Sequence, residues 1–297
     1  MTTPAYDVLT VPVDGGELTC GRWTGGPGAP TVLAAHGITG NHRSWGAVAR
    51  ALDGAVTLVA PDLRGRGRSN VLGAPFGMAA HVADLRALAD RLELERTVLV
   101  GHSMGGFVAT SAANAYPDRF GPLVLVDGGV ALRVPPAADL DAMLEAFLGP
   151  AMARLAMTFP SRTAYSEFFR AHPAIGPHWS EDVEAYVQYD LEGAEPELRS
   201  SCVRAAVRTD GADILLDETV IDAVRTPGLA ATLLWATRGL LDEPEGVYDQ
   251  QRLAEIDLDP ELVRTEAVPG ANHYSIVLAT PYAAAVAEHV RVAASVG

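Results

Sequence analysis

The chain has 297 residues, of which 48% are hydrophobic, and its 37 acidic residues outnumber its 22 basic ones to give a net charge of −15. This length suits one large α/β domain or two smaller ones, and the acidic balance argues against nucleic acid or an anionic membrane as a partner. Every basic residue other than histidine is arginine. Without a lysine the chain can form neither a Walker-type phosphate loop nor a Schiff base with a substrate.

The first 130 residues alternate short apolar runs with helical patterns. Residues 6–12 and 17–23 flank a glycine turn and predict a hairpin. Further strands are predicted at 31–35, 55–60, 97–100 and 123–127, and helices at 44–52, 78–94 and from residue 104 onward. Strands that are apolar throughout and alternate with helices indicate a parallel sheet covered on both faces, and therefore a doubly wound α/β core.

Residues 131–225 interrupt this alternation with a mostly helical pattern rich in large apolar side chains. We interpret this segment as a helical cap inserted after the sixth strand, over the carboxyl end of the sheet. The alternative is a helical layer with no site beneath it. The strand pattern resumes at 230–235 and 261–268, and 281–292 predicts a closing helix. Residues 1–130 and 226–297 would then form one core.

The N-terminus shows no basic segment followed by an apolar one, and no apolar run reaches membrane-spanning length. Cys20 and Cys202 lie far apart and have no metal-ligand spacing, which favours free thiols in a reducing compartment. We therefore expect a cytoplasmic protein that uses no membrane, metal or cofactor and acts on a small molecule. The oligomeric state is left open, and a homodimer is allowed.

The stretch Gly101-His102-Ser103-Met104-Gly105 follows an apolar strand and precedes a helical pattern. In a strand–turn–helix context the pattern G-x-S-x-G predicts a nucleophile elbow, in which the glycines make room for a sharp turn that exposes the serine hydroxyl. Ser103 is therefore the predicted nucleophile, against a purely structural glycine turn. We interpret His102 as a packing residue.

A serine nucleophile needs a base that is itself oriented by a carboxylate, and in sheets of this kind the order is serine, acid, histidine. His273 lies in the loop between the last predicted strand and the closing helix, and is the predicted base. The predicted acid is Asp242, which follows the 230–235 strand. Glu243 beside it and Asp127 at the end of the 123–127 strand remain alternatives.

The oxyanion that forms during acyl transfer needs donors that are already in place, usually backbone N–H groups. The residue after the nucleophile, Met104, supplies one, at the start of a helix whose dipole favours negative charge. The second is expected in the loop His36-Gly37-Ile38-Thr39-Gly40, and by position we assign it to the N–H of Ile38.

Together these motifs resemble those of the α/β-hydrolase superfamily over nearly the whole chain. The similar stretches are His36-Gly37, the loop from Asp62 to Ser69, the elbow, Asn272-His273 and the helical insertion. The resemblance implies a mostly parallel eight-stranded sheet, helices on both faces and a Ser–His–Asp triad under a cap. The loop from Asp62 is common to the superfamily across many chemistries, so we interpret its charges as structural.

The resemblance implies a carboxylesterase-like serine hydrolase that cleaves a small, mainly apolar ester or lactone through an acyl-enzyme. Haloalkane dehalogenases and epoxide hydrolases of this fold use an aspartate nucleophile, so Ser103 argues against both. The alternatives are a carbon–carbon bond hydrolase or a cofactor-free perhydrolase on the same triad. An arginine in the pocket (Arg162, Arg170 or Arg238) would favour acidic substrates of the carbon–carbon kind. From another class, a non-catalytic small-ligand receptor also fits this fold.

Overall fold

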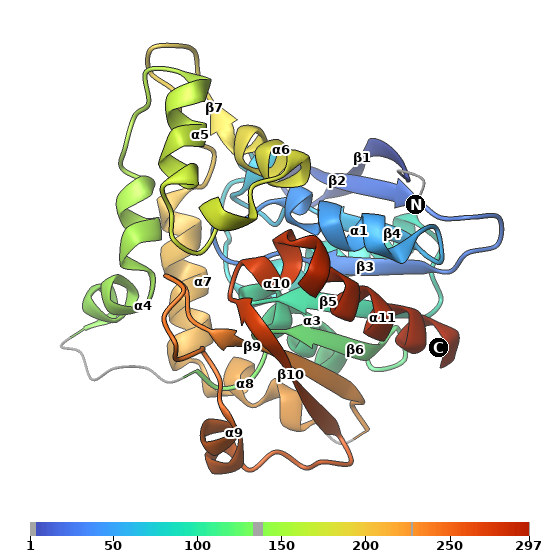
Figure 1. The fold of residues 1–297 in the computed structure, drawn as a ribbon. Coiled ribbons are helices and arrows are strands. Elements are labelled where there is room, and N and C mark those ends of the chain that lie inside the picture. The colour runs from blue at the N-terminus through green and yellow to red at the C-terminus, as the bar shows by residue number, and fades with distance from the viewer. Residues whose placement is uncertain (1–3, 133–138, 227, 297) are drawn as a thin grey trace.

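The computed structural model describes residues 4–132, 139–226 and 228–296, arranged around one eight-stranded sheet (Figure 1). Its strand order is β1-β2-β4-β3-β5-β6-β9-β10; β2 is antiparallel to both of its neighbours and the other pairs are parallel. The strands are β1 (Ala5–Val13), β2 (Gly16–Thr24), β3 (Thr31–Ala35), β4 (Thr57–Pro61), β5 (Thr97–His102), β6 (Phe120–Val126), β9 (Ala231–Arg238) and β10 (Val263–Asn272). The predicted fold class is confirmed.

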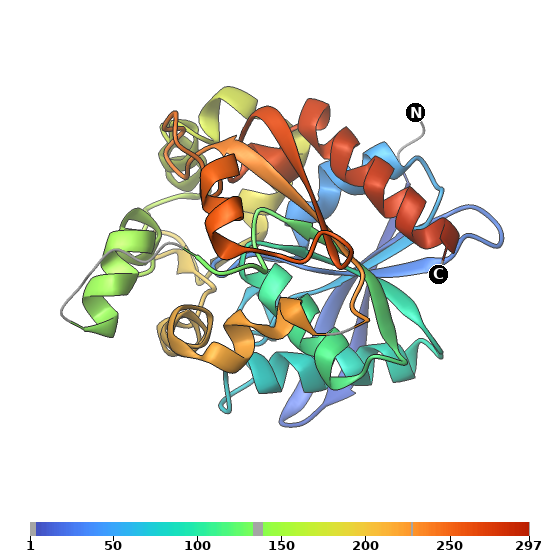
Figure 2. The ribbon, with the colours of Figure 1, turned by 90° about the horizontal axis from the view of Figure 1, so that it is seen from below.

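Helices cover both faces of the sheet, which Figure 2 shows nearly edge-on. One face carries α1 (Gly46–Leu52), α10 (Ser275–Leu278) and α11 (Thr280–Val296); the other carries α2 (Met78–Arg91) and α3 (Met104–Ala115). Successive strand residues point to opposite faces. In β3, Val32 and Ala34 therefore pack into the core on the α11 side, and Leu33 and Ala35 into the core on the α3 side.

Between β6 and β9 the chain leaves the sheet and forms a mostly helical segment. Its elements are α4 (Leu140–Arg154), α5 (Arg162–Arg170), α6 (Glu181–Tyr189), the short pair β7 (Leu191–Glu192) and β8 (Arg199–Ser200), α7 (Arg204–Leu216) and α8 (Glu218–Ile221). The helix α8 packs against α3 in the layer beside the sheet, so the last part of this segment does not lie over the carboxyl ends of the strands. Residues 133–138 of the predicted cap lie outside the described residues.

The remaining short elements connect the core. They are the 3-10 helices η1 (His42–Trp45), η2 (Gly67–Ser69), η3 (Gly176–His178) and η4 (Ala223–Arg225), and the helix α9 (Gln250–Ile256). In the described part of the chain, no helix combines the length and the apolar character needed to cross a membrane.

The loop after β4 is held by buried charges. Asp62 is fully buried, and its carboxylate accepts hydrogen bonds from the ring of His42 (2.8 Å) and from the hydroxyl of Tyr189 (2.8 Å). Arg64 in the same loop forms a buried ion pair with Asp84 of α2. These contacts fit the interpretation of this loop as structural, because each charge has a partner inside the fold.

Candidate active site

Ser103 stands at the sharp turn between β5 and α3. Its backbone has φ 55° and ψ −123°, a conformation that is strained for a residue with a side chain. Glycines permit the turn, because a Cβ on Gly101 would lie 2.1 Å from the carbonyl oxygen of Gly105, and one on Gly105 would lie 2.0 Å from that of Ala35. The half-buried Ser103 and the buried His273 line the same pocket, as a nucleophile and its base must.

The acid that the structure brings to His273 is Asp127. Its Oδ2 lies 2.6 Å from Nδ1 of His273, and its Oδ1 accepts a hydrogen bond from the N–H of Ala236 (3.0 Å). Asp127 follows β6 with φ 47°, and its side chain is fully buried. Since a carboxylate only accepts, Nδ1 of His273 carries the proton and Nε2 is left able to receive one.

The predicted pairing of Asp242 with His273 is wrong in the structure. Both carboxylate oxygens of Asp242 accept hydrogen bonds from the guanidinium of Arg238 (2.8 and 2.9 Å). One of them also accepts a hydrogen bond from Asn272 Nδ2 (3.1 Å). This hydrogen bonding by Arg238 is the main cause of a lowered pKa at Asp242. Glu243, the second alternative, accepts from the N–H of Leu241 in its own turn. The third alternative, Asp127, is the one in contact.

The two predicted oxyanion donors come from the loop after β3 and from the start of α3. Ile38 lines the pocket, and Met104 follows Ser103 as the first residue of α3. Within the ranges that the structure describes, neither backbone N–H has a hydrogen-bond acceptor in the protein. Both N–H groups are therefore available for a developing negative charge.

The loop that carries Ile38 is held at its carbonyl oxygens. The N–H of Gly40 donates to Gly37 O (2.9 Å), and so does Nδ1 of His36 (2.8 Å), whose Nε2 accepts from the N–H of Leu63 (2.9 Å). Because a peptide group is planar, a fixed Gly37 carbonyl also fixes the direction of the Ile38 N–H. The fully buried Arg66, paired with Asp210 of α7, donates to the carbonyl of Ile38 itself (2.8 Å).

His102, the residue before the serine, is bonded to the loop that carries His273. Its Nε2 donates to the backbone carbonyl of His273 (2.8 Å), which ties the elbow to the loop of the base. Burial, reinforced by the nearby His273, lowers the pKa of His102 to about 3, and burial likewise lowers that of His36 to about 3. Both rings are neutral at the pH of any ordinary assay.

These two buried histidines should make the fold sensitive to acid. A histidine whose pKa falls on folding stabilises the protein fully above about 6.5, and this contribution is lost as the pH drops toward 3, because only the unfolded chain takes up the proton. We expect His102→Gln, which keeps a donor for the carbonyl of His273, to lose about 2 kcal/mol less unfolding free energy between pH 7 and pH 5 than the wild type.

Urea unfolding followed by circular dichroism at pH 7 and pH 5 measures both losses. The comparison of two pH values within each protein removes the constant cost of the substitution. If His102→Gln and the wild type lost the same free energy over this interval, the ring of His102 would be taking up its proton in the folded state as well.

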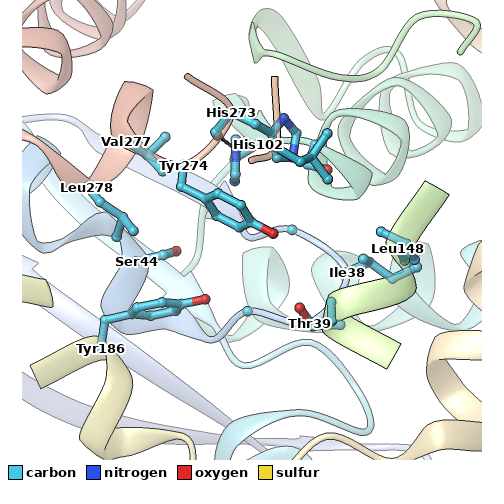
Figure 3. A pocket seen from close by; sticks show the side chains of 15 residues that line it. Ile38, Thr39, Ser44, His102, Leu148, Tyr186, His273, Tyr274, Val277 and Leu278 are labelled. Carbon is cyan, nitrogen blue, oxygen red and sulfur yellow. Dashed lines mark hydrogen bonds between the residues drawn. The ribbon is translucent and has the colours of Figure 1, made fainter. Parts of the chain in front are cut away.

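The pocket beside Ser103 is small and largely apolar (Figure 3). Its cavity measures about 30 Å³, room for a few water-sized groups. A second cavity of about 480 Å³ adjoins it between α4 and the loop after β9. The two share the side chains of Leu148, Ala151, Leu240 and Tyr274. We call them the inner pocket and the outer chamber.

Sequence reasoning missed most of the residues that shape the inner pocket. Tyr186 comes from α6, Leu148 from α4, and Ser44 from η1. The only sequence signal for Tyr186 and Leu148 was the abundance of large apolar residues in the insertion, which does not indicate which of them face Ser103. Nothing in the sequence marked Ser44. The three arginines that were candidates for the pocket do not line it. Arg170 pairs with Glu184, Arg162 is hydrogen-bonded to Gln188, and Arg238 pairs with Asp242.

Residues 30–190, more than half of the chain, match the family model of the alpha/beta hydrolase fold. The chain therefore belongs to the α/β-hydrolase family, as its motifs predicted.

Some of the proteins to which this chain is similar carry the names of hydrolases. Lipase LipV from Mycobacterium tuberculosis is 43% identical over 133 residues, which are 43% of this chain and 50% of the lipase. A fluoroacetate dehalogenase from Burkholderia sp. is 38% identical over 120 residues, 39% of either chain. The matched part spans only 29% to 50% of the curated relatives considered.

Among solved structures, E-2-(acetamidomethylene)succinate hydrolase is similar with a TM-score of 0.77 and 19% identity, over 96% of this chain and 99% of that one. At a sequence identity of 19%, this similarity shows a shared fold and no more.

Proposed function

We propose that this protein is a serine hydrolase that cleaves small carboxylic esters or lactones through an acyl-enzyme. The observation that carries the proposal is the geometry at the elbow. Ser103 shares a pocket with His273, the far ring nitrogen of His273 is bonded to the buried Asp127, and two backbone N–H groups beside the serine have no protein acceptor within the described ranges. The similarity to a lipase supports the same conclusion.

In the proposed reaction the oxygen of Ser103 attacks the ester carbonyl while Nε2 of His273 takes the hydroxyl proton. The N–H groups of Ile38 and Met104 stabilise the oxyanion of the tetrahedral intermediate. The carbon–oxygen bond to the alcohol then breaks, and His273 returns the proton to the departing oxygen. Water, deprotonated by His273, attacks the acyl-enzyme, and the carboxylic acid leaves with Ser103 restored. Asp127 holds the protonated Nδ1 of His273 throughout.

The lining of the site supports an uncharged substrate. None of the described residues lining the inner pocket is an arginine, an aspartate or a glutamate, so an acidic substrate would find no counter-charge there. This argues against the acidic dienol substrates of a carbon–carbon bond hydrolase. A serine at the elbow argues against dehalogenation, although one relative carries that name. We place the segment between β6 and β9 as the cap of this site.

A panel of p-nitrophenyl esters from acetate to decanoate tests the proposal. Because the inner pocket is small, we expect acetate to butyrate to be cleaved with the highest kcat/KM, and decanoate at least tenfold more slowly. Leu148 is one of the four residues that line both the inner pocket and the outer chamber. Leu148→Ala should therefore shift the optimum to longer acyl chains.

The matched control is Leu144→Ala, one turn earlier on α4, which removes a buried leucine that does not line either cavity. It should lose comparable stability, about 2–5 kcal/mol, without changing the preference for chain length. A wild-type protein that cleaves no ester in the panel, and that a fluorophosphonate probe does not label, would contradict the proposed function and favour a non-catalytic ligand receptor.

A further inference from the structure

Four hydroxyl groups interrupt the apolar lining of the inner pocket. They belong to Thr39, Ser44, Tyr186 and Tyr274, which come from the loop after β3, from η1, from α6 and from the turn before α10. Figure 3 shows these side chains converging on one space, with the phenol groups of Tyr186 and Tyr274 pointing inward from opposite walls. We call these four residues the hydroxyl cluster.

The hydroxyl groups of the cluster have no hydrogen-bond partner among the described residues. Ser44 is only 5% exposed and its Oγ is buried without an acceptor or donor. Tyr186 is 9% exposed, and its hydrogen bond to Asn41 uses the backbone carbonyl. The hydrogen bond of Tyr274 to Asn272 likewise uses its backbone N–H. Buried polar groups are normally satisfied, since an unmade hydrogen bond costs about 1–3 kcal/mol.

The two phenols are suited to donate to a neutral oxygen. Burial raises the pKa of Tyr186 and that of Tyr274, so both keep their protons at neutral pH. The buried Arg154 is near enough to both tyrosines to act on them electrostatically, but its charge is already matched by Asp190. The cluster therefore offers O–H donors without a net charge, which fits a hydroxyl, ether or carbonyl oxygen better than a carboxylate.

We infer that the hydroxyl cluster binds a second oxygen of the substrate, so that the preferred substrates are small esters or lactones whose acyl part carries a hydroxyl, ether or oxo group. This inference rests on the proposed function and narrows its substrate class. The inner pocket takes the acyl part because it lies directly beside Ser103, whereas the larger outer chamber, bordered by the exposed Leu241, leaves room for the alcohol.

The test compares p-nitrophenyl methoxyacetate with p-nitrophenyl butyrate, two esters of equal chain length that differ by one ether oxygen in place of a methylene. The measured quantity is the ratio of their kcat/KM values in the wild type, divided by the same ratio in each variant. Differences in intrinsic reactivity between the two esters cancel in this quotient. Tyr186→Phe and Tyr274→Phe should each lower the preference for methoxyacetate about fivefold to tenfold, the value of one hydrogen bond.

Ser44→Ala provides a third variant that removes a hydroxyl without touching an aromatic ring, in case either tyrosine variant folds poorly. Tyr282→Phe is the matched control, because Tyr282 lies on α11, stacks edge-on against His178 and does not line the inner pocket. It should keep the wild-type ratio.

The outcomes distinguish failure of the inference on substrate class from failure of the proposed serine hydrolase function. If the wild type cleaves both esters and the quotient stays at one in all three variants, the inference on substrate class is overturned and the serine hydrolase stands. If the wild type cleaves neither ester and no fluorophosphonate adduct forms, the proposed function fails and the inference fails with it.

Discussion

Ser103→Ala should reduce the kcat for ester hydrolysis by a factor on the order of 10⁵ to 10⁶, the loss expected when the nucleophile of a serine triad is removed. The substitution removes a single oxygen and leaves the elbow, the oxyanion donors and the pair of His273 with Asp127 in place. What remains should be the weak acceleration that comes from binding and from the N–H groups of Ile38 and Met104. The measurement is the initial rate with p-nitrophenyl butyrate under saturating conditions.

Intact-mass spectrometry after treatment with a fluorophosphonate gives an independent check. The wild type should gain one adduct and Ser103→Ala none. Ser111→Ala is the matched control, because Ser111 lies on the same helix α3, about two turns beyond the elbow and outside the inner pocket. Labelling or turnover that survives in Ser103→Ala at the wild-type level would assign the reactive group to another residue.

Asp127→Asn should reduce kcat by a factor on the order of 10⁴, whereas Asp242→Asn should change it less than tenfold. In the wild type Oδ1 of Asp127 accepts from the N–H of Ala236, and Oδ2 accepts from Nδ1 of His273. An asparagine would keep its oxygen toward Ala236 and turn its NH₂ group toward His273. Nδ1 would then have to accept, and the proton would move to Nε2, where it blocks uptake of the proton from Ser103.

Asp242→Asn is the natural control for this experiment, because it makes the same chemical change in the acid that the sequence favoured. It weakens the ion pair with Arg238 at a position whose side chain is about one-third exposed. The pH dependence of kcat/KM, measured on both variants, separates loss of the correct tautomer from a general loss of folded protein. A larger loss of kcat in Asp242→Asn than in Asp127→Asn would contradict the role that we propose for Asp127.

Local patterns were enough to predict the sheet, because strands buried on both faces must be apolar throughout. The predicted strand at 31–35 coincides with β3, and those at 97–100 and 123–127 match β5 and β6 to within a few residues. The elbow was equally readable, since a turn this tight accepts only glycine at two positions. A motif of this kind is local, and so is its physical cause.

The acid that pairs with His273 could not be predicted from a local motif. Asp127 and Asp242 both follow strands and are both aspartates with positive φ. They differ in what surrounds them: Arg238, four residues before Asp242, neutralises it, while Asp127 lies fully buried beside the loop of His273. The bias toward Asp242 came from the order of the motifs along the chain, and that order does not specify which of two neighbouring strands carries the acid.

The sequence by itself therefore determined the fold. It also predicted the serine, its base and the two backbone donors, because each of these predictions depends on a few consecutive residues. Only the tertiary structure decided the acid and the lining of the pocket. Asp127 is 146 residues from His273, and the hydroxyl cluster gathers residues from 39 to 274 on four separate elements. Such side chains come together only after the sheet and the segment between β6 and β9 have packed against each other. No local pattern indicates which residues of each element will face Ser103.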